Sequence, residues 1–162
     1  MDIRTINQQN FDQVCRIYKA GIETGIATFQ NDIPDWDSWD KSHLSNCRIA
    51  MFDGDEMIGW AALTPVSGRC VYAGVAEVSV YVATNFRGKR IGELLLNSLI
   101  TESENDGLWT LQSGIFAENI NSIKLHEKCG FRQIGYREKI GMKGGIWKDN
   151  IIMERRSKIV GI

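Results

Sequence analysis

The sequence predicts a mixed α/β fold, and three observations support this prediction. Apolar residues recur at helical spacing in several stretches of the chain. Between them lie runs with the two-residue alternation of strands, and turn residues such as glycine separate these runs. The order is strands first, then a central strand, turn and helix, and finally a β-α-β unit. No repeat, low-complexity tract or linker is present, so we expect a single domain over residues 1–162.

The first part of the chain is expected to form a strand, a helix, a loop and a second helix. DIRTI, at residues 2–6, has the pattern of a short strand. Apolar residues from Phe11 onward fall at helical spacing and predict an amphipathic helix over about residues 8–22. The segment after it is irregular around Pro34, and a second helix is predicted to begin near Trp36.

The middle of the chain is expected to form a hairpin, a long strand and a helix. Residues 47–66 are two apolar runs joined by DGDE, whose Asp-Gly pair supplies the turn. Residues 70–82 read as one long strand that crosses the centre of the fold. A helix is predicted over residues 90–103. Alternation along the strand places its residues on two faces, with Ala76, Val78, Val80 and Val82 on one and Glu77, Ser79 and Tyr81 on the other.

The last part of the chain is expected to form a strand, a helix and two strands. WTLQSGIF, at residues 109–116, is the predicted strand. Residues 119–131 follow as a helix, and Gly130 is placed to end it in the left-handed conformation. Two strands, near residues 132–138 and 146–156, complete the predicted fold.

Charge and composition exclude several classes of function. The formal net charge is −1 and the sequence pI is about 6.1, so no overall positive field favours nucleic acid or acidic membranes. No apolar run has the length of a signal peptide or a membrane span. The four cysteines are far apart, and with only two histidines a zinc site is not expected. We therefore expect a cytoplasmic protein with reduced thiols, without a metal and without a nucleic-acid or membrane partner.

The segment RGKRIG, at residues 87–92, predicts an anion site. It places three basic side chains and two glycines where a strand ends and a helix begins. Free N–H groups and the helix dipole favour an anion there, most plausibly a phosphate. The nucleotide P-loop and the Rossmann glycine pattern are both missing from the sequence. A solvated basic turn without a ligand is the alternative.

Several motifs resemble a known family. The strand VAEVSVYV, the turn that follows it and SIKLHEKCGF at residues 122–131 are similar to the GNAT superfamily of N-acetyltransferases. ATFQ at residues 27–30 and YAGVAEVSVYV at residues 72–82 resemble its phosphinothricin N-acetyltransferase branch. The resemblance covers roughly residues 2–155. It implies a central, mostly antiparallel twisted sheet, flanked by helices on both faces, with a splayed cleft for acetyl-CoA.

The resemblance implies that acetyl-CoA is the cosubstrate. Its pyrophosphate would lie on N–H groups from Gly88 to Glu93, and its pantetheine arm would add to the central strand by main-chain bonds. Arg90 stands where the family usually has glycine, which is compatible with a residue already in helical dihedrals. The implied cofactor residues are Val80, Tyr81, Val82, Arg87, Gly88, Lys89, Arg90, Ile91, Gly92, Glu93, Asn119 and Ser122.

Acetyl transfer to an amine needs a base, an oxyanion donor and an acid. Glu77, an inward and partly buried carboxylate by the strand pattern, is the candidate general base. The alternative is that it only pairs with a cationic residue in the sheet. A main-chain N–H, from Val80 or a neighbour, is the expected oxyanion donor. His126 stands where many relatives carry a tyrosine and is a candidate acid, although such histidines are often structural.

The acceptor implied by the resemblance is a small amino-acid-like amine of the phosphinothricin, methionine sulfoximine or methionine sulfone type. Some members of the branch carry an arginine where this chain has Ala73, so a carboxylate contact could be missing or come from Arg69. The alternative for the aromatic Trp147 is a place in the core. The expected substrate residues are Thr28, Phe29, Tyr72, Trp147 and Asp149.

Two other functions stay open at this point. The same cofactor could serve a peptide or protein N-terminal acetyltransferase, which a wide, acidic groove would favour. The domain could also be a non-catalytic acyl-CoA-binding sensor, which would not need Glu77. A homodimer is possible, and exposed aromatic residues near Trp36 and Trp39 could support it.

Overall fold

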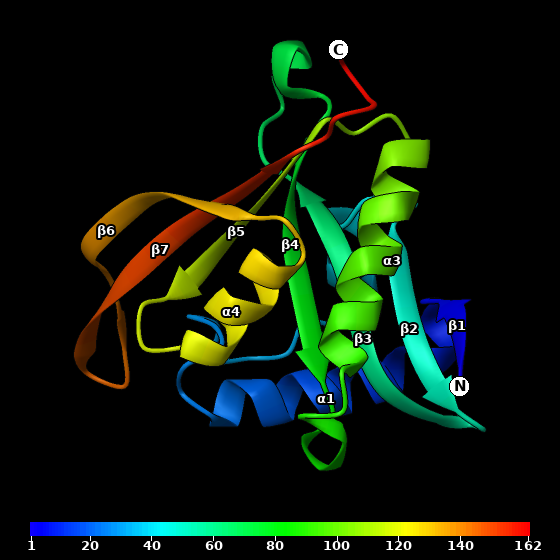
Figure 1. Cartoon of the computed structure of the whole chain (residues 1–162). Coiled ribbons are helices and arrows are strands. Elements are labelled where there is room, and N and C mark those ends of the chain that lie inside the picture. The colour runs from blue at the N-terminus through cyan, green and yellow to red at the C-terminus, as the bar shows by residue number, and fades with distance from the viewer.

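The computed structural model describes residues 1–162, and its centre is one seven-stranded sheet with helices on both faces (Figure 1). The strand order is β1-β2-β3-β4-β5-β7-β6. Every neighbouring pair is antiparallel except β4 and β5, which are parallel. The predicted mixed fold with a mostly antiparallel sheet is confirmed. The strands are β1 (Asp2–Thr5), β2 (Arg48–Asp53), β3 (Glu56–Pro65), β4 (Val75–Val82), β5 (Thr110–Phe116), β6 (Arg132–Lys143) and β7 (Ile146–Arg156).

The helices lie on the two faces of the sheet, with α3 and α4 in front of it and α1 behind it in Figure 1. None of them has the combination of length and apolar character that crossing a membrane would require. The four α-helices are α1 (Phe11–Glu23), α2 (Trp36–Ser42), α3 (Ile91–Asn105) and α4 (Ile120–Lys128), and short 3-10 turns are formed by Gln8–Asn10, Cys70–Tyr72 and Thr84–Phe86.

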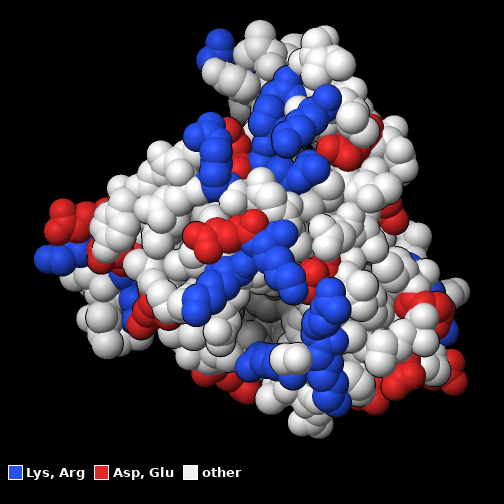
Figure 2. Space-filling view, in the orientation of Figure 1, with Lys and Arg blue, Asp and Glu red and all other residues white.

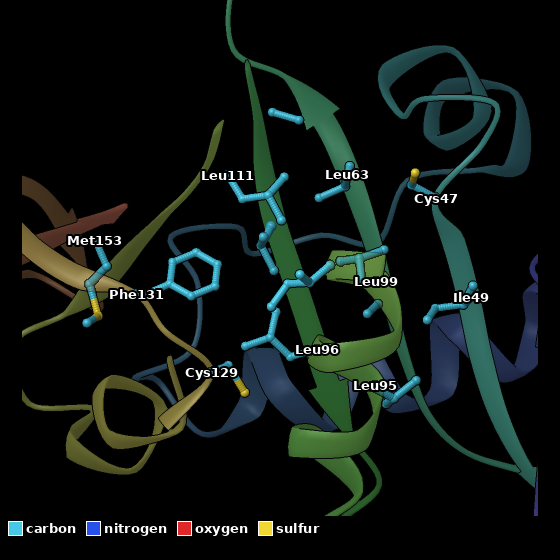
Figure 3. Close-up of a cluster of buried hydrophobic side chains, with 14 of the residues drawn as sticks. Cys47, Ile49, Leu63, Leu95, Leu96, Leu99, Leu111, Cys129, Phe131 and Met153 are labelled. Atoms are coloured by element: carbon cyan, nitrogen blue, oxygen red, sulfur yellow. The ribbon is translucent and has the colours of Figure 1, made fainter. Parts of the chain in front are cut away.

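The larger hydrophobic core lies between the sheet and α3 and α4. Leu95, Leu96 and Leu99 of α3 are fully buried in it, and Figure 3 shows them next to strand residues such as Leu63 and Leu111. Full burial of such a side chain contributes roughly 1.5–3 kcal/mol. Ala76 and Val78 are buried in this core, and Val80 and Val82 pack against it. The predicted apolar face of the central strand is therefore confirmed.

A second core lies between the sheet and α1 and α2. Trp39 and Trp60 are fully buried in it, and Trp36 packs against it with its ring 5.3 Å from that of Phe11. The expectation that Trp36 and Trp39 are exposed is therefore wrong. Both face inward because α2 lays its aromatic face on the second core.

The predicted helix starts differ from the structure by a few residues. The helix expected from residue 8 begins with a 3-10 turn, which Asn7 caps by accepting hydrogen bonds from Gln9 and Asn10. The α-helix proper then starts at Phe11. The second helix begins at Trp36 as predicted, because the Asp35 carboxylate accepts a hydrogen bond from the Ser38 N–H (2.8 Å).

The central strand starts later than predicted. Cys70–Tyr72 forms a 3-10 turn, and the strand begins at Val75. The reason lies at Gly74, where a Cβ atom would be 2.0 Å from the Trp109 ring. The Trp109 ring can pack there only against a bare backbone, and the main-chain N–H of Trp109 donates to the Gly74 carbonyl (2.9 Å). The chain therefore enters the sheet at this point.

The turns and the last elements follow the prediction more closely. The hairpin of β2 and β3 turns at Gly54, which has a φ of 64°. Gly130 follows α4 with a φ of 88°, as the helix-ending residue should. Strand β6 is longer than expected and continues to Lys143. All four cysteines are free.

Candidate active site

The candidate site is a cleft where β4 and β5 separate. The two strands pair only from Val75 to Glu77 and from Thr110 to Gln112. Both strands continue beyond these pairs, and Figure 1 shows β5 turning away from β4. A cavity of about 980 Å³ fills the gap, and its lining residues come from both faces of the sheet. The predicted splayed cleft is present.

One wall of the cleft is a strand edge. Ala83 donates to the Ile58 carbonyl, and Val66 donates to the Val75 carbonyl. In an antiparallel ladder these bonds alternate, so the intervening even-numbered residues of β4 direct their N–H and C=O groups away from β3. Val78, Val80 and Val82 therefore present main-chain groups to the gap beyond Glu77. An extended ligand could bond there as an added strand.

A second wall is the turn before α3 and the first turn of that helix. No N–H group from Gly88 to Glu93 donates a hydrogen bond to a protein acceptor, and the first helical bond runs from Leu94 to the Arg90 carbonyl. Gly88 has a φ of 75° and open space where a Cβ would be. Six consecutive free N–H groups at a helix start form a site for an anion.

Basic side chains gather around the mouth of the cleft. Figure 2 shows them around a dark hollow on the face that carries α3 and α4. Arg87 donates to the Val82 carbonyl (3.4 Å), and Glu93 forms ion pairs with Arg90 (3.1 Å) and Lys128 (2.7 Å). Hydrogen bonds from Arg90 and then Lys128 lower the pKa of Glu93 to about 2. Glu93 is thus ionised and joins the start of α3 to the end of α4.

Two residues of the turn differ from expectation. Arg90 does not have helical dihedrals but a left-handed conformation, with a φ of 64°. This conformation suits glycine, and Arg90 adopts it because the chain reverses there to begin α3. Lys89 does not line the cleft, and its ammonium lies 4.8 Å from the centre of the Phe86 ring.

Glu77 lines the cleft at the point where β4 and β5 part. Its carboxylate accepts a hydrogen bond from the Gln112 amide (3.3 Å). It forms no ion pair, so the alternative role of pairing with a cation inside the sheet is not supported. The side chain is exposed, contrary to the expected partial burial, because the gap beside it is open.

His126 is buried beside the cleft. Its Nδ1 lies 2.7 Å from the Ser122 carbonyl oxygen. Because a carbonyl only accepts, Nδ1 carries the proton, and the neutral ring leaves an unprotonated Nε2. Nε2 is buried and has no partner. Burial lowers the pKa of His126, so the ring presents an acceptor and not an acid at neutral pH.

Asn119, Ser122 and Tyr81 also line the cleft. Asn119 caps α4 by accepting from the Ser122 N–H (3.3 Å), and its amide donates to the Ile26 carbonyl (3.3 Å). Its side chain thus ties the loop after α1 to α4. The Tyr81 ring stacks on Trp60 and is so buried that its pKa is strongly raised.

The opposite side of the cleft is walled by the loop after α1. Thr28 and Phe29 line it as predicted from the sequence. The Phe29 ring lies 4.4 Å from that of Phe116, and a Cβ on Gly141 would be 2.7 Å from it. Phe29 is thus held between β5 and β6. The loop forms a fixed aromatic wall.

Three of the expected substrate residues do not line the cleft. Tyr72 lies exposed in the 3-10 turn before β4. Trp147 is also exposed, at the start of β7, so it lies neither in the cleft nor in the core. Asp149 binds the Tyr136 hydroxyl and the Lys139 N–H instead. Trp147 and Asp149 miss the cleft because β6 and β7 extend past it, and Tyr72 misses it because its turn precedes β4.

Gln112, Arg137 and Asn150 are among the lining residues that were missed from the sequence. Arg137 lies among several charged residues of an exposed strand, and nothing in the sequence distinguishes it from them. Asn150 gave a signal, since it begins the otherwise apolar run NIIM. No group of three or more His, Cys, Asp or Glu residues is arranged to hold a metal ion.

Comparison with known proteins adds independent findings. The family model described as "Acetyltransferase (GNAT) family" matches residues 12–131. A phosphinothricin N-acetyltransferase from Alcaligenes faecalis is 30% identical over 165 residues, which cover 94% of this chain and 81% of the relative.

Solved structures share the whole architecture. Ribosomal-protein-alanine N-acetyltransferase from Brucella melitensis superposes with a TM-score of 0.89 at 28% identity, covering 97% of this chain and 100% of that one. The Salmonella typhimurium protein yncA, solved "with its cofactor Acetyl-CoA", has a TM-score of 0.89 at 25% identity and covers 96% and 93% of the two chains. The fold that contains the separated strands and the helix start is therefore shared with these solved acetyltransferase structures.

Proposed function

The chain belongs to the acetyltransferase (GNAT) family, and from this premise we propose that it transfers the acetyl group of acetyl-CoA to the primary amine of a small amino-acid-like substrate. Acceptors of the phosphinothricin, methionine sulfoximine or methionine sulfone type are the proposed class. The name of the Alcaligenes faecalis relative supports this choice.

One observation carries the proposal. Six free N–H groups, from Gly88 to Glu93, stand at one end of a cleft whose wall presents the main chain of Val78, Val80 and Val82. The first set suits a diphosphate, and the second suits an amide-containing arm that bonds like a strand. Together they match the two polar parts of coenzyme A, and they support binding of the thioester near Glu77.

Glu77 is the proposed general base. Its carboxylate would take a proton from the acceptor ammonium, directly or through a water, because the open gap beside it admits both. The neutral amine would then attack the thioester carbon, so that a C–N bond forms and the C–S bond breaks. Such a base contributes about 10²–10⁴ in rate. We propose the Val80 N–H as oxyanion donor, since it faces the gap.

His126 enters the proposal as an acceptor. Its bare Nε2 could receive a hydrogen bond from a group bound in the cleft. To protonate the leaving thiolate it would first have to gain a proton, against its lowered pKa. We propose a relay in which Nε2 first accepts a proton released by the amine and then donates it to the sulfur. In this relay Nε2 begins unprotonated, and the thiolate still receives its proton.

A peptide N-terminus is the second candidate acceptor. The name of the Brucella melitensis structure favours it. The cleft argues for the smaller substrate, since its acceptor side is walled by Phe29 and Phe116 and has Glu77 as its one acidic residue. A wide acidic groove for a peptide is therefore not what the lining residues form.

The test is an acetyl-CoA consumption assay across amino acids, sulfoximines, polyamines and short peptides. We expect turnover with methionine sulfone or phosphinothricin and release of one thiol for each acetylated amine. Turnover with peptides alone would move the assignment to the second candidate. Coenzyme binding without turnover on any acceptor would overturn the enzymatic proposal in favour of a sensor.

We also propose that the chain forms one domain and a homodimer in the cytoplasm. One sheet contains strands from both ends of the chain, which supports a single domain. The hairpin of β6 and β7 exposes Ile140, Met142, Ile146 and Trp147, each by half or more, beside the free edge of β6. Such an apolar edge favours pairing with another chain. Light scattering on the purified protein tests the dimer, and a monomer at micromolar concentration would contradict it.

A further inference from the structure

A row of three residues crosses the acceptor side of the cleft. Asn150 of β7 stands directly opposite Phe116 of β5 on one side and Arg137 of β6 on the other. Directly opposite residues in a sheet direct their side chains to the same face. All three residues line the cleft. The row is on the same face as Phe29, whose ring packs on Phe116.

Asn150 is a buried amide whose oxygen has no donor. Its exposed fraction is 8%, and Oδ1 has no hydrogen-bond partner. The amide lies over Gly114, where a Cβ would be 3.2 Å from Oδ1. Buried polar side chains are nearly always bonded, so an unused amide beside a cavity indicates that something else completes its hydrogen bonds.

Arg137 is the one charged side chain of the cleft without a hydrogen bond. Among the other charged lining residues, Arg90 and Glu93 pair with each other, Arg87 bonds the Val82 carbonyl, and Glu77 bonds Gln112. No acidic residue lies within ion-pair distance of Arg137, although it stands beside the buried amide of Asn150. Its positive charge is therefore available to a ligand.

We propose that Arg137 and Asn150 recognise an acidic group on the acceptor amine, a carboxylate or a phosphinate. This proposal rests on the proposed function. A guanidinium presents a planar set of donors that matches such a group with two parallel bonds. The Asn150 amide can donate to the same group, and its oxygen can accept from Arg137, so the unused atoms of both side chains are satisfied. The apolar part of the acceptor would lie on Phe29 and Phe116.

The assignment narrows the acceptor class. Plain amines and polyamines lack the acidic group, and they would leave the charge and the amide unpaired. A peptide has its α-carboxylate converted to an amide next to the reacting amine. The acidic group could be the α-carboxylate of an amino acid or an acid at the far end of its side chain. The α-carboxylate and the distal acid would bind Arg137 in the same way, and the experiment distinguishes which of the two is bound.

The experiment compares wild type with R137Q and R132Q on matched acceptors. Arg132 is the control because it lies on the same strand, pairs with Glu154 and does not line the cleft. The acceptors are methionine sulfone, its carboxamide, and 3-aminopropylphosphinic acid, which has only a distal acid. We expect R137Q to lower kcat/KM about 10- to 100-fold for an acidic acceptor and to leave the carboxamide unchanged. R132Q should change neither.

The acceptor whose turnover falls in R137Q shows which acidic group Arg137 binds. Methionine sulfone alone indicates the α-carboxylate, and the phosphinic acid alone indicates a distal acid. An equal effect of R137Q on acidic and neutral acceptors, or no effect on either, overturns the proposal while the acetyltransferase function stands.

A binding measurement separates this proposal from the function it rests on. Methionine sulfone and the phosphinic acid are titrated by calorimetry into wild type and R137Q saturated with CoA, where no acetyl transfer can occur. We expect binding that weakens about 10-fold or more in R137Q. If wild type binds no acidic acceptor, or binds it as R137Q does, the proposal fails whatever the turnover assay gives.

Discussion

Glu77 and Gln112 are the last residues that pair β4 with β5, and the amide of Gln112 donates to the carboxylate of Glu77 over 3.3 Å. The candidate base therefore stands at the point where the sheet opens. Gln112 holds the carboxylate with a neutral donor, which leaves its negative charge uncompensated. A cation in the place of Gln112 would compete with the acceptor ammonium for the same oxygen atoms.

The first prediction concerns Glu77→Gln. We expect kcat to fall by about 10²–10⁴, because the amide cannot take up a proton, while the Kd of CoA stays unchanged. Steady-state kinetics and calorimetry measure the two quantities. Glu118→Gln is the control, since Glu118 is exposed, pairs with Lys148 and lies outside the cleft. Full activity in Glu77→Gln would remove Glu77 from the mechanism.

The second prediction concerns the left-handed conformation of Arg90. Arg90→Gly and Arg90→Ala both lose the ion pair with Glu93, so their difference isolates the backbone. We expect the glycine variant to be more stable by about 1 kcal/mol, because alanine keeps the steric cost of a positive φ. Urea unfolding measures it. Equal stability of the two variants would mean that the turn relaxes to another conformation.

The third prediction concerns His126 and pH. Burial lowers the pKa of His126 in the folded protein below the ordinary 6.5 of the unfolded chain. At pH values between these two pKa values the unfolded chain therefore binds more protons than the folded protein. The free energy of unfolding should therefore decrease as pH falls below 6.5, and His126→Gln should lose this part of the slope.

Urea unfolding of the two proteins between pH 7.5 and about 5 tests it. The pKa of His43 is also lowered by burial, but His43 is present in both proteins and cancels in the comparison. Identical slopes would show that the ring is protonated as easily in the folded protein as in the unfolded chain.

The fourth prediction concerns Glu93, whose pKa is lowered to about 2 by Arg90 and Lys128. Its ionised form stabilises the fold fully above the ordinary pKa of 4.5, and this contribution is lost as pH falls from there toward 2. The Tm difference between wild type and Glu93→Gln should therefore shrink in this window. Scanning calorimetry at several pH values measures it, and a constant difference would argue against the ion pairs.

Local patterns predicted most of the fold. Alternation along residues 75–82 placed Val78 on the apolar face that packs in the core and Tyr81 on the opposite face, because a strand's faces depend only on its own residues. The start of that strand was not predictable in the same way. It depends on Trp109, which is far away in the sequence and packs on Gly74. Long-range packing of this kind leaves no local signal.

The candidate site was predicted only in part, because local patterns indicate some of its features and long-range packing determines the others. The free N–H groups follow from where a helix begins, which the sequence indicates. The acceptor wall depends on how far β6 and β7 extend past the cleft, so Trp147 was misplaced and Arg137 was missed. Tyr72 was misplaced because the central strand begins only after it. The backbone of Arg90 was also missed, because arginine rarely has a positive φ, although the glycine usual at this position in the family was a signal for it.

The separation of β4 from β5 has a consequence for the protein before it meets a coenzyme. β4 is fourth of seven strands, yet half of it has the bonding state of an outermost strand. The amides of Val80 and Val82 should exchange with deuterium rapidly for a strand so deep in the molecule. A bound pantetheine arm would restore their protection, and the melting temperature would rise with coenzyme concentration.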